Sequence, residues 1–177
     1  GENQVSHKIR DTYIIDGYNL MSNWPEVQEV ENFADQRGKL VHRLGEYGAY
    51  EGYDLIIVFD APFTEDAEHT EKINDHLSLV FTGSGETADS VIERLTYTLA
   101  GRGSLYVVTS DAAEQTVVLG AGAYRIPCRE FVKQIRRAKK RLKRDYLGTV
   151  TLPLSRNEIG AHLDDKVSAK LDTLRRM

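Results

Sequence analysis

The sequence predicts an α/β fold in which helices cover both faces of a mainly parallel β-sheet, a three-layer sandwich. Short runs of β-branched and apolar residues alternate with longer segments of helical periodicity over roughly the first 130 residues. The runs are apolar throughout, not at every second position, as strands covered on both faces require.

In the first half, a strand is expected at Tyr13–Asp16, ending in a turn at Gly17. A helix should follow from Phe33 to about Tyr47 and end near Gly48, since Phe33, Leu40, Val41 and Leu44 share a helical spacing. Residues 54–59 form a second apolar strand. The polar stretch 63–74 is expected to be a loop with one helical turn, and 76–81 a third strand.

In the second half, a helix is expected from Thr87 to Ala100 and a fourth strand at 104–109. A short helix at 112–119 and an edge strand at 123–126 should come next. The remaining expected elements are a basic helix from about 129 to 146 and a final amphipathic helix after Gly148, capped near Ser155 or Asn157.

The bulk composition is that of an ordinary globular domain. The chain has 177 residues, of which 41% are hydrophobic and 28% charged. Its apolar runs are far shorter than the ~20 residues that cross a bilayer, and no leader-like segment is visible, so we expect a cytoplasmic protein that does not use a membrane. Cys128 stands alone and cannot form an internal disulfide or a thiolate metal site.

The net charge of −4 conceals a strong asymmetry. Eight basic residues and no acid lie between positions 133 and 144, which leaves 15 basic against 27 acidic residues elsewhere. Such segregation has two equally good interpretations, a nucleic-acid-binding helix on an acidic body and a solvated helix face. The candidate nucleic-acid-binding residues are Lys133, Arg136, Arg137, Lys139, Lys140, Arg141, Lys143 and Arg144.

Acidic residues recur where expected strands end. Asp16, Asp60 and Asp111 follow three strands, and Glu86 and Asp89 open the helix that follows another. A parallel sheet brings these ends to one edge, where ligands bind in such folds. Carboxylates gathered there repel one another unless a cation intervenes, and oxygen-rich clusters suit Mg²⁺ or Mn²⁺.

Each of these residues also has a structural interpretation. Asp16-Gly17 is a common turn dipeptide, Asp60 can simply end a strand, and Asp111 can cap a helix. The recurrence after four strands is what favours a site. Neighbouring polar and aromatic residues likewise have a functional and a structural interpretation. Asn19 and Ser110 can orient a phosphate or cap a helix. The aromatic side chains can stack on bases or pack in the core; they are Tyr18, Trp24 and Tyr146.

Four segments together resemble a known family. They are residues 13–20 (YIIDGYNL), 58–61 (VFDA), 85–89 (GETAD) and 108–111 (VTSD), and in this order they are similar to the YacP-like branch of the NYN domains, nucleases related to PIN domains. The resemblance implies a PIN-like nuclease domain over 13–146, with 147–177 as a C-terminal helical extension. It also implies that Asp16, Asp89 and Asp111 bind metal, that Glu86 and Asn19 support catalysis, and that Asp60 lies nearby. mRNA turnover, including cleavage coupled to the ribosome, is the implied role.

The predicted activity is therefore endonucleolytic hydrolysis of RNA by a metal-activated water, leaving 5′-phosphate and 3′-hydroxyl ends. Two other classes stay open. A non-catalytic RNA- or ribosome-binding module would need the basic helix but not the acids. A metal-dependent phosphatase for a small molecule would need the acids but not the basic helix.

Overall fold

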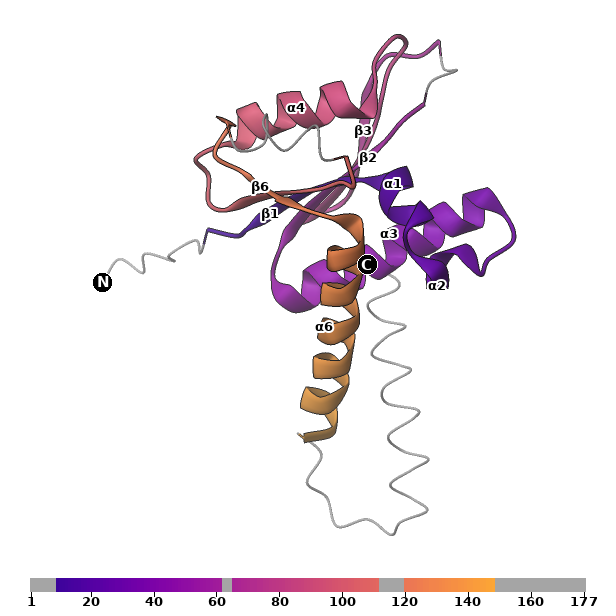
Figure 1. Ribbon diagram of the computed structural model, residues 1–177, viewed down its shortest axis with the longest axis vertical. Helices are drawn as coiled ribbons and strands as arrows, with labels where there is room; N and C mark the ends of the chain where they lie inside the picture. The colour runs from indigo at the N-terminus through magenta and orange to yellow at the C-terminus, as the bar shows by residue number, and fades with distance from the viewer. Residues whose placement is uncertain (1–8, 62–64, 112–119, 149–177) are drawn as a thin grey trace.

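In the computed structural model, which describes residues 9–61, 65–111 and 120–148, a six-stranded sheet separates two layers of helices (Figure 1). The strands are β1 (Thr12–Asp16), β2 (Asp54–Phe59), β3 (His69–Asn74), β4 (Leu77–Phe81), β5 (Leu105–Val108) and β6 (Tyr124–Ile126). The helices are α1 (Gly17–Ser22), α2 (Pro25–Gln28), α3 (Phe33–Glu51), α4 (Ala88–Leu99) and α6 (Cys128–Gly148).

The sheet has the order β3-β4-β2-β1-β5-β6 and is parallel except for β3. Alternate residues of β1 enter opposite cores because successive side chains of a strand point to opposite faces. Ile14 packs in the core under α4, whereas Tyr13 and Ile15 pack with α3 and α6. Figure 1 shows α4 on one side of the sheet and α3 and α6 on the other, which confirms the predicted three-layer architecture.

The prediction of a loop over residues 63–74 is wrong in part. Residues 69–74 form β3, which pairs antiparallel with β4, while residues 62–64 lie outside the described ranges. Strand β3 is an edge strand because it is first in the strand order. Most of its side chains are exposed, so it is held by its hydrogen bonds to β4 and not by an apolar face. A segment of this kind carries no hydrophobic signal in its sequence.

The end predicted for the first long helix is also wrong. Helix α3 continues through Gly48 to Glu51 and is capped by Gly52, whose φ of 78° is left-handed. Gly48 serves packing instead: a Cβ there would lie 2.9 Å from Cδ1 of Leu55, so its absence lets α3 approach β2.

Strands β1, β2, β4, β5 and β6 and helices α4 and α6 match their predictions within one or two residues, whereas the two short helices α1 and α2 were not predicted. The helices expected at 112–119 and after Gly148 lie outside the described residues. Among the described helices, none is both long enough and apolar enough to cross a membrane.

Candidate active site

The site begins where β1 passes directly into α1. Asp16 is the last residue of β1 and caps α1, its Oδ1 accepting the backbone N–H of Asn19 at 3.3 Å. The prediction of a turn at Gly17 is therefore wrong, because Gly17 is the first residue of helix α1. A Cβ on Gly17 would lie 2.5 Å from the ring of Phe59, so only glycine lets α1 start this close to β2.

Asp60 and Asp89 join Asp16 around an open cleft of about 780 Å³ at the carboxyl edge of the sheet. Asp60 follows β2, and its Oδ1 accepts the hydroxyl of Thr82 at 3.3 Å. Asp89 lies in the first turn of α4, which Thr87 and Ser90 begin with a reciprocal capping box. The described residues that line the cleft, none of them basic, are Asp16, Tyr18, Asn19, Ser22, Phe33, Asp60, Thr87, Ala88 and Asp89.

Asn19 connects this cleft to the end of β5. Its Oδ1 accepts the backbone N–H of Ser110 at 2.7 Å and the thiol of Cys128 at 3.0 Å. One amide therefore joins α1, the segment after β5 and the first residue of α6. Asp111 is exposed and lies next to this junction, with its own N–H donating to the Thr109 hydroxyl at 3.2 Å.

The electrostatics show that three other aspartates act on the carboxylate of Asp16. Burial raises the pKa of Asp16 from 3.8 to about 6. The Asn19 N–H opposes this rise, whereas the charges of Asp89, Asp60 and Asp111 add to it. The structure thus brings the expected aspartates, but not Glu86, within electrostatic reach of Asp16.

The donor chemistry of the cleft suits a hard cation, since it offers carboxylate and amide oxygens and an excess of negative charge. Within the described ranges, however, no three acidic, histidine or cysteine side chains are grouped closely enough to hold a metal ion. Mg²⁺ usually keeps several waters and takes one or two carboxylates, so a hydrated ion matches this spacing better than a closed cage.

Glu86 lies apart from the cleft. Its Oε1 accepts the backbone N–H of Gly83 at 3.0 Å, and its Oε2 accepts from Arg94 at 3.4 Å. Arg94 also pairs with Glu68, so these contacts hold the β4–α4 loop against the start of β3. The carboxylate is thereby directed to Arg94, and any contribution to chemistry would go through the loop that precedes Asp89.

Among the aromatic candidates, only one borders the cleft. Tyr18 is half-buried and lines it. Trp24 is 2% exposed and donates its indole N–H to Glu26, so it packs in the core and is closed to bases. Tyr146 is half-buried near the end of α6.

Sequence reasoning missed Phe33 as a site residue. It was assigned to the apolar face of its helix, yet its side chain is 56% exposed and lines the cleft. Its position was a usable signal, because Phe33 lies seven residues before Leu40, the next apolar residue of that face, with only polar or small residues between them.

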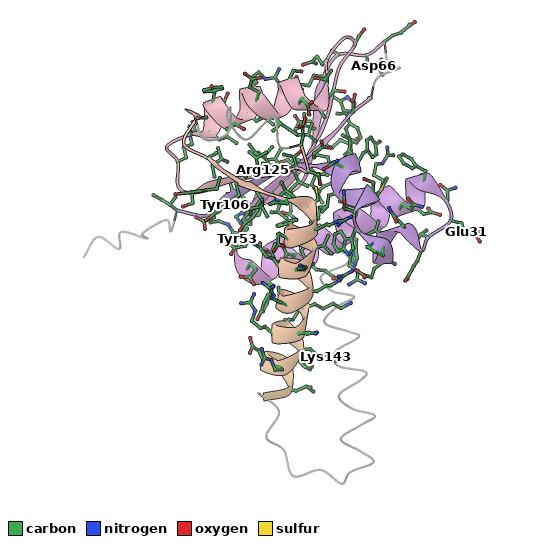
Figure 2. All side chains as sticks on the ribbon, viewed as in Figure 1. Glu31, Tyr53, Asp66, Tyr106, Arg125 and Lys143 are labelled. Carbon is green, nitrogen blue, oxygen red and sulfur yellow. The ribbon has the colours of Figure 1, made fainter. Side chains whose placement is uncertain are left out.

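The basic residues of α6 are exposed on the surface of the helix. Arg136 pairs with Glu26, Arg141 with Glu51, and Lys133 with Glu130. No carboxylate of the described chain pairs with Arg137, Lys140, Lys143 or Arg144, and Figure 2 shows Lys143 toward the end of α6 farther from the sheet. Helix α6 starts at the Asn19 junction, so its basic surface extends away from the acids by up to about 25 Å.

The chain is similar to known proteins over most of its length. The model of the YacP-like NYN domain family matches residues 13–176. The uncharacterized protein YacP of Bacillus subtilis (strain 168) is 33% identical over 137 residues, which make up 76% of this chain and 80% of YacP.

Two solved structures of Rae1 (YacP) from Bacillus subtilis also match. A tryptophan-to-leucine variant has a TM-score of 0.69 and covers 94% of this chain and 96% of its own. The other structure has a TM-score of 0.66, with 94% and 95% covered, and both are 28% identical to this chain. The division at residue 146 stays a prediction, because residues 149–177 lie outside the described part.

Proposed function

The chain belongs to the YacP-like NYN family, whose domain is a PIN-like nuclease domain associated with RNA, and from this we propose that it is a metal-dependent endoribonuclease. The observation that carries the proposal is the cleft where Asp16, Asp60 and Asp89 meet at the carboxyl edge of the sheet. In an open α/β sheet this edge, next to the central strand, is where ligands bind.

The proposed reaction is in-line hydrolysis at phosphorus. A water oxygen forms the new bond to phosphorus, the bond to the 3′ oxygen breaks, and the products carry a 5′-phosphate and a 3′-hydroxyl. A bound Mg²⁺ or Mn²⁺ would supply Lewis-acid stabilisation of the phosphate and a more acidic water. Of the three acids that the family resemblance implies, Asp16, Asp89 and Asp111, one or two would bind the ion directly and the rest through its waters, with Asp60 close by.

The chain's own groups would prepare this site. A pKa of about 6 leaves Asp16 about nine-tenths ionised at pH 7, which suits a cation ligand. Asn19 fixes the Ser110 backbone and would keep Asp111 facing Asp16. Glu86 would act indirectly, through the loop that carries Asp89.

The basic helix α6 would hold the RNA backbone. Phosphate contacts by Arg and Lys position a nucleic acid without reading its sequence. We propose a cytoplasmic enzyme that acts on mRNA, including mRNA held on a ribosome, as the family resemblance implies.

The test is RNA cleavage by purified Asp16→Asn and Asp89→Asn variants in the presence of Mn²⁺. We expect each to lose at least about 100-fold in rate, since each removes charge from the proposed cation site. Glu93→Gln is the matched control, because Glu93 is an exposed carboxylate one turn beyond Asp89 on α4. Full activity of both aspartate variants, on free RNA and on ribosome-bound mRNA, would exclude this mechanism.

The binding-module alternative draws on the basic residues of α6 that pair with no described carboxylate. It predicts that wild type and Asp16→Asn bind RNA equally and that neither cleaves free or ribosome-bound RNA with Mn²⁺. Cleavage by wild type alone would reject the module.

A further inference from the structure

A continuous row of rings leads from the acid cleft to the edge of the sheet. Phe33 and Tyr18, which line the cleft, have ring centroids 5.2 Å apart, and Tyr18 lies 5.1 Å from Phe59. Phe59 and Phe81 stack at 5.6 Å, and Phe81 and His69 stack at 4.9 Å with an interplanar angle of 15°. We call these five residues the ring row.

A cation lies over the middle of the row. The Arg37 guanidinium carbon is 6.0 Å from the Phe59 centroid and 5.7 Å from the Phe81 centroid. Its Nη1 also donates to the Tyr18 hydroxyl at 3.5 Å. Phe59 is fully buried and forms the floor, while Phe33 and His69 are exposed and Tyr18 and Phe81 are half-buried.

Core packing does not account for the outer part of this row. Helix α3 buries Leu40, Leu44 and Tyr47 against the sheet, and this is the face that holds it in place. Phe33, at its first position, stays 56% exposed against Tyr18 and so gains little from burial. An exposed ring beside a half-buried tyrosine and an arginine is instead the composition of a surface that stacks nucleobases.

We propose that the cleft end of the ring row, Phe33 and Tyr18 backed by the buried Phe59, is a stacking surface for the unpaired bases of an RNA strand whose backbone enters the acid cleft. The cleavage step rests on the function proposed above, whereas the stacking does not. Bases would lie against Phe33 and Tyr18 at the mouth of the cleft, with Arg37 near their phosphates and His69 at the far end. Every base has a flat face, so the surface selects single strands over duplexes with little regard for sequence.

The test measures binding of a short, fluorescein-labelled RNA without self-complementarity to the Asp89→Asn protein, in which the RNA stays intact. Phe33→Ala should weaken binding about 5-fold or more, and Phe33→Trp should restore it, because stacking depends on the ring. The matched control is Tyr97→Ala, since Tyr97 is also 56% exposed but lies on α4. Unchanged binding by Phe33→Ala would overturn the proposal.

A second probe tests whether the bases themselves are recognised. An abasic oligonucleotide with the same backbone should bind Phe33→Ala and its parent equally. If Phe33→Ala weakens the abasic strand or a duplex as much as the single strand, then the row does not stack bases and the proposal fails. If Phe33→Ala loses single-strand binding but wild type does not cleave RNA, the stacking surface is supported and the nuclease function is rejected. If wild type cleaves RNA but Phe33→Ala binds it normally, the nuclease function is supported and the stacking surface is rejected.

Discussion

The Asp16 carboxylate ends β1 and caps α1, at a position half-buried among like charges. Burial penalises its ionised form and three neighbouring aspartates add to the penalty, so its pKa rises from 3.8 to about 6. In the range between these values the folded protein binds a proton that the unfolded chain releases. The free energy of unfolding therefore falls as pH rises from about 4 to about 6, and it stays lower above that range.

Asp16→Asn should thus stabilise the metal-free protein at pH 7, because the neutral amide can still cap α1 without the buried charge. We expect a gain of about 1–3 kcal/mol in the free energy of unfolding, which shrinks toward pH 4. Urea unfolding at the two pH values in the presence of a chelator measures it. Glu93→Gln, which removes an exposed charge, should change little, and an equal or lower stability of Asp16→Asn at pH 7 would contradict the argument.

At this scale the sequence predicted residue types better than their orientations. Asp16 could be placed because it ends a strand that a hydrophobic run defines, and Asp89 because it opens the helix that follows another such strand. Glu86 could not, because Arg94 draws its carboxylate away, and Arg94 lies eight residues further along the chain. The contact between Asn19 and Ser110 spans 91 residues and has no local signature.

Among the elements, those with a strong apolar pattern were predictable and those held by pairing were not. Strand β2 is predicted to the residue, since it is apolar and buried on both faces. Strand β3 was missed because its exposed side chains carry no alternation, and its structure comes from hydrogen bonds to β4. The end of α3 was misplaced because a glycine can indicate either close packing or a helix end, and only the tertiary structure distinguishes Gly48 from Gly52.

Helix α6 allows a prediction that belongs to the whole element. Replacing Arg137, Lys140, Lys143 and Arg144 by Gln should weaken RNA binding and flatten its salt dependence. The slope of log K against log salt should fall by about 0.7 for each phosphate that the variant no longer neutralises. Binding measured between low and moderate salt tests this, with exposed Arg102→Gln, outside α6, as the control. A slope unchanged in the fourfold variant would remove α6 from the RNA interface.

The site as a whole depends on strand order. After β1 the chain adds β2 and then β4 on one side, and α4 carries it back to β5 on the other side of β1. The reversal places Asp16 at the centre, between the acids that follow β2 and β5. The sequence indicated parallel strands, but their order is set by long-range pairing, so the meeting of these acids could be expected only from the general rule for such sheets.

Cation binding in the acid cleft should stabilise the whole fold. A ligand that binds only the native state adds RT ln(1 + [L]/Kd) to the free energy of unfolding, or about 2.7 kcal/mol at 100 times Kd. We expect Mn²⁺ to raise the Tm of the wild type at pH 7.5, and to bind about tenfold more weakly at pH 5, where Asp16 must first lose its proton. Thermal unfolding with and without Mn²⁺ measures the shift. Glu93→Gln should keep it and Asp89→Asn should lose most of it, so equal shifts in these two variants would place the cation elsewhere on the molecule.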